Sequence, residues 1–185
     1  MRIVGGSLRG RRIIAPAGRG TRPTSDQRRE SVFNILEHAE WAPPLAGAVV
    51  ADVFAGSGAL GLEAISRGAA YCLFVEQDAG ARAASRENIE AMGLFGSTRV
   101  FRRDATRLKV PPSNLRGRFD LVFLDPPYGK GLAEPAVRSL LRQGLAQEGG
   151  VFVVEDGAET ELNLPELEVL DTRVWGAGKV WFLRA

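Results

Sequence analysis

The clearest chemical signal in the sequence is the tetrad Asp125-Pro126-Pro127-Tyr128, which directly follows an apolar run at residues 121–124. The two prolines prevent a preceding strand from continuing and restrict the backbone, so the Pro126 carbonyl can face a ligand beside the Asp125 carboxylate. Tyr128 adds a flat aromatic face with a polar tip. Two acceptors beside a stacking face suit a planar amine, such as the exocyclic NH2 of a nucleobase, whose nitrogen could then attack a sulfonium methyl group. The alternative is a plain proline turn, which needs no acid at this spacing.

A glycine-rich loop lies upstream of the tetrad, between a predicted strand and a predicted helix. Gly56, Gly58 and Gly61 satisfy the pattern G-x-G-x-x-G. Glycines at such a turn let the backbone approach a ligand that lies over the carboxyl ends of the strands. The pattern alone is a weak indicator, because a tight strand-to-helix turn without a ligand also produces it.

Three acids mark the ends of three successive predicted strands. Asp52 lies near the end of the first, Glu76 ends the second about 20 residues after Gly56, and Asp104 ends the third. We expect Asp52 to bind a ligand's ammonium group directly or through water, Glu76 to accept from ribose hydroxyls, and Asp104 to meet an adenine amino group. Ribose recognition fits NAD and S-adenosylmethionine equally. A carboxylate at position 52 would repel the pyrophosphate of NAD, so it favours S-adenosylmethionine.

The arginines cluster at the N-terminus. Residues 1–29 hold eight arginines against the single acid Asp26, a net charge of +7, so a chain total of +2 leaves −5 for the other 156 residues. A basic block on a mildly acidic body is typical of a polyanion-binding segment, because phosphate contacts release counterions. The alternative is a general preference for arginine along the whole chain.

Length and composition restrict the remaining classes. At 185 residues, 45% hydrophobic and 25% charged, the chain fits one globular domain with at most a short extension. One cysteine and one histidine permit no internal disulfide and no metal cluster, so we expect no metal. The apolar runs are shorter than the roughly 18 residues that a membrane span needs, and the first 30 residues lack a signal-peptide core. We therefore expect a cytoplasmic protein without membrane contact.

The order of predicted elements indicates an α/β fold. Near-continuous apolar strands alternating with helices favour a mainly parallel sheet covered on both faces, followed by an antiparallel C-terminal hairpin. A short hairpin at residues 2–14 and a helix opened by a Thr24–Gln27 capping box and running to Ala39 precede the sheet. We predict strands at residues 49–54, 72–76, 99–103, 121–124, 151–155, 167–175 and 179–184, and helices near 58–68, 79–92 and 131–147.

Taken together, the residues resemble a known family. The loop and tetrad are similar to those of class I, Rossmann-like S-adenosylmethionine-dependent methyltransferases that modify exocyclic amines. The segments 5–11, 22–36 and 54–64 more narrowly resemble the bacterial RsmD family, which methylates the N2 amine of a guanine in 16S ribosomal RNA.

The resemblance covers nearly the whole chain and has several implications. It implies a seven-stranded methyltransferase domain at residues 45–185, and a basic hairpin and helix extension at 1–44 that contacts RNA. The expected partner is 16S rRNA or the small ribosomal subunit, and the expected state is a monomer. The implied catalytic residues are Asp125, Pro126, Pro127 and Tyr128; the S-adenosylmethionine contacts are Asp52, Phe54, Gly56, Ser57, Gly58, Glu76, Asp104, Ala105 and Asp125; and the RNA contacts are Arg9, Arg11, Arg12, Arg22 and Arg28.

Three other functions remain open at this point. An adenine-N6 methyltransferase acting on DNA or RNA would use the same tetrad, although no insert is large enough for a duplex-reading domain. A nicotinamide-dependent oxidoreductase would explain the glycine loop but leaves the tetrad unexplained. A non-catalytic RNA-binding module would explain the arginines alone.

Overall fold

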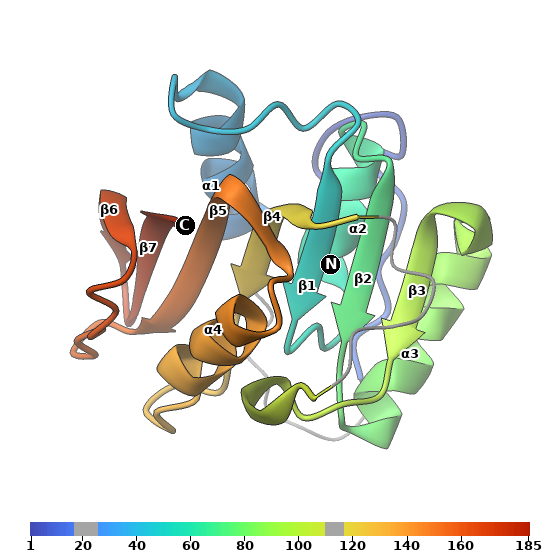
Figure 1. The fold of residues 1–185 in the computed structure, drawn as a ribbon. Helices are drawn as coiled ribbons and strands as arrows, with labels where there is room; N and C mark the ends of the chain where they lie inside the picture. Colours follow the sequence, from blue (N-terminus) through green and yellow to red (C-terminus); the bar gives the residue numbers. More distant parts are fainter. Residues whose placement is uncertain (17–25, 110–116) are drawn as a thin grey trace.

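The computed structural model describes residues 1–16, 26–109 and 117–185, and its centre is a seven-stranded sheet (Figure 1). The strand order is β3-β2-β1-β4-β5-β7-β6. Strands β1 to β5 pair in parallel, whereas β7 is antiparallel to both β5 and β6. The strands are β1 Val49–Val53, β2 Tyr71–Val75, β3 Thr98–Phe101, β4 Phe119–Leu124, β5 Ala146–Gly157, β6 Glu168–Trp175 and β7 Gly178–Arg184.

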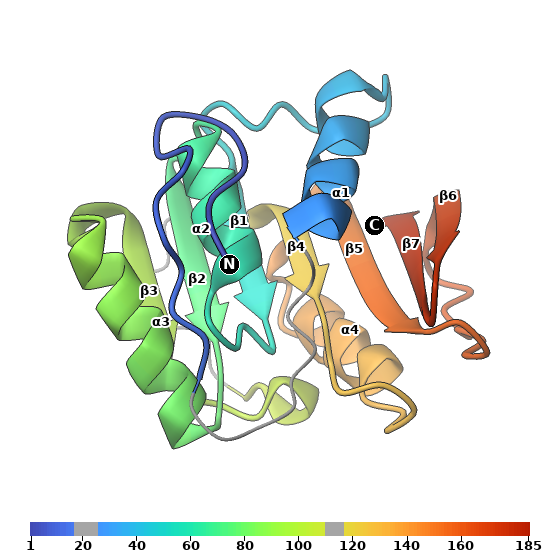
Figure 2. The same ribbon diagram turned by 180° about the vertical axis from the view of Figure 1, so that it is seen from behind.

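Helices cover both faces of this sheet. One face carries α1, α2 and α3 (Figure 2), and the other carries α4 (Figure 1). Alternate strand residues supply the two cores, because successive side chains of a strand point to opposite faces. Phe74 and Phe123 belong to the first core, and Leu73 and Val122 belong to the second. The helices are α1 Asp26–His38, α2 Ala59–Ser66, α3 Ala79–Ala91 and α4 Ala133–Arg142, with short 3-10 turns at Phe95–Ser97 and Ala105–Arg107.

The predicted α/β fold, its parallel sheet and its antiparallel C-terminal hairpin are confirmed, but some bounds differ. The helix predicted near 131–147 ends at Arg142, because Gly144 turns the chain with a φ of 61° and β5 begins at Ala146. Thr24 of the predicted capping box lies outside the described residues. Within the described ranges, every helix is too short or too polar to span a lipid bilayer.

The predicted hairpin at residues 2–14 contains only one antiparallel bridge, between Arg2 and Arg12. Instead of forming regular strands, this segment docks onto α2. The buried carboxylate of Glu63 accepts the backbone N–H groups of Val4 and Gly5 at 2.9 and 2.8 Å. Backbone hydrogen bonds from Ile3 to Arg11, from Gly10 to Ile3 and from Ile13 to Met1, each at 2.9 Å, join the two arms of the hairpin. The Glu63 carboxylate satisfies the backbone of Val4 and Gly5, which these bonds leave out.

The N-terminal extension shares a core with the rest of the protein. Ile3 and Ile13 from the docked segment and Phe33 from α1 belong to the same buried cluster as Val50 and Phe74 of the sheet. Phe33 also packs against Phe123, with ring centroids 5.4 Å apart. The extension at residues 1–44 is thus packed on the sheet over its described length rather than held apart from it.

Candidate functional site

The predicted catalytic and cofactor-binding residues lie at the carboxyl edge of the parallel strands. Val53 of β1 pairs with Val75 of β2 and with Leu124 of β4. The chain therefore leaves three adjacent strands at the same level, which places the glycine loop, Glu76 and Asp125 side by side. This is the position where ligands bind in open α/β sheets.

The glycine loop has the backbone that its sequence requires. Gly56 and Gly58 have φ values of 57° and 81°, and Phe54 is the one non-glycine residue among those described with a positive φ, at 60°. A bulky residue in this region is strained, which is typical of functional sites. Gly61 has a different role, because a Cβ there would lie 2.5 Å from the Cys72 sulfur and from Phe74. Gly61 thus allows α2 to pack closely against β2.

Asp52 and Glu76 both hold the loop in place. Asp52 is 1% exposed, and its Oδ2 accepts the Gly61 N–H at 2.9 Å. The two oxygens of Glu76 accept the N–H groups of Gly56 and Asp78, each at 2.9 Å. Burial raises the pKa of Asp52 well above its usual value, and the neighbouring Asp125 and Glu76 add to the effect. The sequence did not predict that these two acids hold the loop. They do so through protein hydrogen bonds, in addition to any contact that they make with a ligand.

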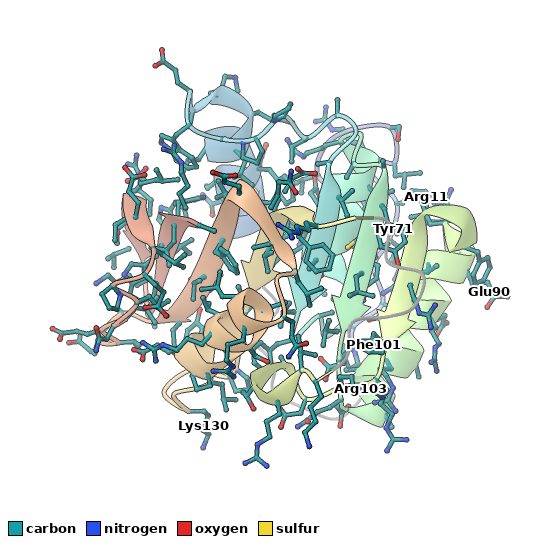
Figure 3. All side chains as sticks on the ribbon, viewed as in Figure 1. Arg11, Tyr71, Glu90, Phe101, Arg103 and Lys130 are labelled. Atoms are coloured by element: carbon teal, nitrogen blue, oxygen red, sulfur yellow. The ribbon has the colours of Figure 1, made fainter. Side chains whose placement is uncertain are left out.

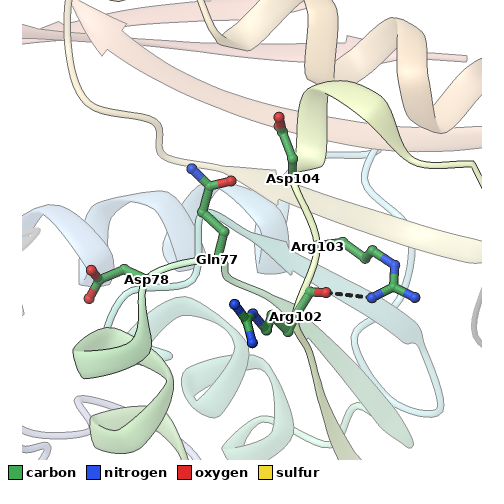
Figure 4. A pocket seen from close by; sticks show the side chains of 5 residues that line it. All are labelled: Gln77, Asp78, Arg102, Arg103 and Asp104. Atoms are coloured by element: carbon green, nitrogen blue, oxygen red, sulfur yellow. Dashed lines mark hydrogen bonds between the residues drawn. The ribbon is translucent and has the colours of Figure 1, made fainter.

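An open, polar cavity of about 540 Å³ lies between the ends of β2 and β3 (Figure 4). The side chain of Asp104 is exposed, and its Oδ1 accepts the N–H and hydroxyl of Thr106 at 2.9 and 2.7 Å. Ala105 is buried beside it. The cavity is large enough for a nucleoside, and its acids can accept hydrogen bonds from one. Its lining residues are Gln77, Asp78, Arg102, Arg103 and Asp104.

Hydrogen bonds hold both the backbone and the side chains of the tetrad region. The Asp125 N–H donates to the Val53 carbonyl at 3.3 Å, and the Gly129 N–H donates to Asp156 Oδ1 at 3.0 Å. Between them, the hydroxyl of Tyr128 donates to Glu155 Oε1. Pro126 is buried and Pro127 is exposed. The tetrad is therefore a braced lip above the ends of β1 and β4.

Sequence reasoning missed the two acids that brace this lip. Glu155 and Asp156 are 5% and 1% exposed and follow the apolar run 151–154 of β5. An acid after a buried strand is the same signal that identified Asp52, Glu76 and Asp104, so the pattern could have found them. Burial and the hydrogen bond to Glu155 raise the pKa of the Tyr128 phenol, which remains neutral and can donate.

The predicted RNA-binding arginines do not form one surface. Arg28 lies in the wall of the site, with Nη1 2.9 Å from the Tyr128 hydroxyl and 2.5 Å from Glu155. Arg22 lies outside the described residues. Arg11 donates to the Ala91 carbonyl at the far end of α3, opposite Arg103 and Lys130 in Figure 3. The arginines of the basic block are thus separated in the structure. Arg29 forms a buried ion pair, Arg28 lies in the wall of the site, and Arg11 lies on a distant surface.

The docked segment explains why these arginines lie far from the tetrad. Ser7 and Leu8 donate their backbone N–H groups to Ser66, the last residue of α2. Helix α2 follows β1 and runs back from the carboxyl edge, so its last residue lies at the amino edge. Arg9 is therefore near the amino edge as well. Contacts from Arg9 and Arg11 would reach a part of an RNA away from a base held at the tetrad.

Comparisons with known proteins agree with this geometry. A family model described as "Conserved hypothetical protein 95" matches residues 1–184. Ribosomal RNA small subunit methyltransferase D of Escherichia coli (strain K12) is 40% identical over 169 residues, which cover 86% of this chain and 78% of that protein. The Haemophilus influenzae protein of the same name is 32% identical over 167 residues, with 90% and 83% covered.

Solved structures show the same fold over the whole chain. The Escherichia coli protein yhhF superposes with a TM-score of 0.79 at 31% identity, and the match covers 100% of this chain and 97% of that one. A hypothetical protein of Thermus thermophilus gives a TM-score of 0.75 at 31% identity, with 100% and 99% covered. SMU.776, described as a methyltransferase complexed with SAH, gives a TM-score of 0.59 at 19% identity over 86% of this chain and 49% of that one, a likeness of fold alone.

Proposed function

We propose that this chain, which belongs to the RsmD family of ribosomal RNA small subunit methyltransferases, methylates the exocyclic N2 amine of a guanine in 16S rRNA. The observation that carries the proposal is the meeting of three features at one sheet edge. They are the glycine loop, the cavity beside Asp104 and the Asp125–Tyr128 lip, all on a chain matched to the family over residues 1–184. A ligand over the loop would lie next to an amine held by the lip.

S-adenosylmethionine fits the acceptors at this edge, and when bound it supplies a methyl group on a positively charged sulfur. Asp104 lines the cavity where its adenine would lie, with the buried Ala105 next to it in the chain, and Glu76 would accept from its ribose hydroxyls. Phe54, Gly56, Ser57 and Gly58 would line its amino-acid part. The buried carboxylate of Asp52 would favour the ammonium group, because opposite charges attract strongly where water is excluded.

The lip would hold the target amine by accepting its protons. Asp125 and the Pro126 carbonyl would offer two acceptors from adjacent residues, and hydrogen bonds to both protons would leave the nitrogen lone pair directed out of the ring plane. The Tyr128 ring would stack on the base. Its hydroxyl is already bonded to Glu155 and Arg28, so the ring face rather than the phenol is what meets the substrate.

RNA contact would involve cations at both the carboxyl edge and the amino edge of the sheet. Arg103 and Lys130 are exposed at the carboxyl edge, where the target base would enter (Figure 3). Arg9, Arg11 and Arg12 are exposed on the docked segment and would contact a more distant part of a large RNA.

Replacing Arg9, Arg11 and Arg12 together with alanine should weaken RNA binding and flatten its salt dependence. Each lost phosphate contact lowers the log–log slope by about 0.7–0.9, so the loss is at most about 3. Filter binding at several salt concentrations measures this slope, and an Arg103→Ala/Lys130→Ala variant serves as the comparison. An unchanged slope in the triple variant would assign RNA contact to other residues.

One assay tests the proposed reaction. Transfer of labelled methyl from S-adenosylmethionine is measured in parallel to small ribosomal subunits, naked 16S rRNA and duplex DNA, and the labelled nucleotide is identified. N2-methylguanine in 16S rRNA supports the proposal. N6-methyladenine in any acceptor would instead support the alternative that the tetrad also permits, and labelling of none would overturn both.

A further inference from the structure

The Tyr128 hydroxyl is the centre of a network that joins three distant parts of the chain. Arg28 comes from α1, Glu155 from the end of β5, and Tyr128 from the lip. Arg28 Nη1 donates to the Tyr128 hydroxyl at 2.9 Å and to Glu155 Oε1 at 2.5 Å, and the Tyr128 hydroxyl donates to the same oxygen. Arg28 Nη2 reaches the Trp175 carbonyl at 2.8 Å, at the end of β6.

The network is largely shielded from water. The Arg28 and Glu155 side chains are 23% and 7% exposed. A paired carboxylate in such a place resists the loss of any partner, because an unpaired buried charge is costly. The arrangement therefore holds the tyrosine in one position more firmly than an exposed ion pair would.

Close packing at the β6–β7 turn shows that the network fills its space. A Cβ at Gly178 would lie 2.7 Å from the Tyr128 hydroxyl, 2.8 Å from Arg28 Nη1 and 3.2 Å from Glu155 Oε1. Gly178 is not among the residues with a positive φ. It is required for space rather than for backbone conformation, and the turn closes directly over the three polar groups.

We propose that Arg28 and Glu155 are positioning residues for Tyr128: they fix its hydroxyl so that the aromatic ring presents one face to the incoming base. This inference rests on the proposed function, because it supposes a base at the lip. The inference goes beyond the proposed function because it assigns an effect on catalysis to the Arg28–Glu155 ion pair, which lies outside the tetrad. Its physical basis is that a displacement of about 1 Å in a reacting geometry can lower a rate by about 100-fold.

The variants Tyr128→Phe, Glu155→Gln and Arg28→Lys test this assignment. Each preserves the approximate size of the side chain, and each removes one element of the network: the hydroxyl, the negative charge or the guanidinium fork. The chain has two tyrosines, so Tyr71→Phe is the matched control for deletion of a buried hydroxyl away from the lip. Steady-state kcat and both KM values, with melting temperatures, are measured for all variants and for Tyr128→Phe/Glu155→Gln.

We expect Tyr128→Phe and Glu155→Gln each to lower kcat by about 10-fold or more, with KM for S-adenosylmethionine changed less than about twofold. The double variant should be no slower than the slower single variant, because the two groups act as one unit. Arg28→Lys keeps the positive charge but loses the guanidinium fork, so its kcat should fall less than that of Glu155→Gln. Unchanged kcat with a lowered melting temperature, or multiplicative losses in the double variant, would overturn the proposal and leave a purely structural brace.

A second measurement does not depend on activity. With 13C-labelled tyrosine, NMR should show ring signals from two residues only. Glu155→Gln and Arg28→Lys should shift those of Tyr128 and leave those of Tyr71 unchanged. Unshifted Tyr128 signals in both variants would refute the network itself. If the variants show these shifts but the wild-type protein labels no RNA, the network stands and the proposed function is refuted instead.

Discussion

Replacing Glu63 with glutamine should strongly destabilise the protein. Its carboxylate accepts four donors: Gly5 N–H and Arg67 Nε on Oε1 at 2.8 and 2.9 Å, and Val4 N–H and Arg29 Nε on Oε2 at 2.9 and 3.3 Å. An amide can accept on one side only, so two donors would face its NH2 group. Arg29 would lose a charge partner while remaining fully buried.

The size of the effect follows from this geometry. Breaking a buried ion pair by removing one partner costs about 3–5 kcal/mol. Asp26 stays 2.8 Å from Arg29, so we expect the lower end, about 3 kcal/mol. For a chain of this size that corresponds to a fall in melting temperature of about 6–12 °C.

Urea unfolding followed by tryptophan fluorescence measures the change, and amide hydrogen exchange should show faster exchange at the Val4 and Gly5 N–H groups. Glu168→Gln is the matched control, because the side chains of Glu168 and its ion-pair partner Arg184 are 63% and 35% exposed and the pair should contribute less than about 1 kcal/mol. A loss of stability in Glu63→Gln no larger than that in Glu168→Gln would show that the buried carboxylate is not an essential partner of these four donors.

Asp125→Ala should lower turnover by about 100-fold or more while S-adenosylmethionine affinity, measured by calorimetry, remains nearly intact; equal loss of both would show that its role is wrongly assigned. Asp52→Asn should weaken cofactor binding without loss of stability at neutral pH. The folded protein holds the Asp52 proton more tightly than the unfolded chain, so wild-type stability relative to the variant should fall as pH rises above about 4, and a rise would contradict this. Gly178→Ala should reduce kcat more than Gly176→Ala, which has a φ of 61° but no neighbour within 4 Å; each should cost about 1–2 kcal/mol of stability in urea, and equal kcat values would contradict the packing argument.

The sequence predicted the sheet and the meeting of its strand ends because apolar runs and turn residues are local signals. Successive apolar runs indicated the parallel strands, and the acids after them marked the site edge. Asp52, Glu76 and Asp125 were placed correctly at that edge for this reason. Glu155 and Asp156 carry the same signal but were not singled out.

Tertiary partners could not be predicted in this way. Arg28 and Arg29 are neighbours of identical type, yet one braces the lip and the other is a fully buried partner of Glu63. A count of charges assigns both to a basic surface. The different roles of Arg28 and Arg29 arise only when α1 docks on the sheet. That docking depends on contacts between residues about 34 to 127 positions apart in the chain.

The docking of the N-terminal segment on α2 has a consequence for biosynthesis. Val4 and Leu8 find their acceptors on Glu63 and Ser66, which are 59 and 58 residues later in the chain. At about 5–20 residues per second, translation leaves the first residues without these partners for about 3–12 s. The charges of the nascent segment would keep it hydrated, and therefore less prone to aggregate, until α2 has formed.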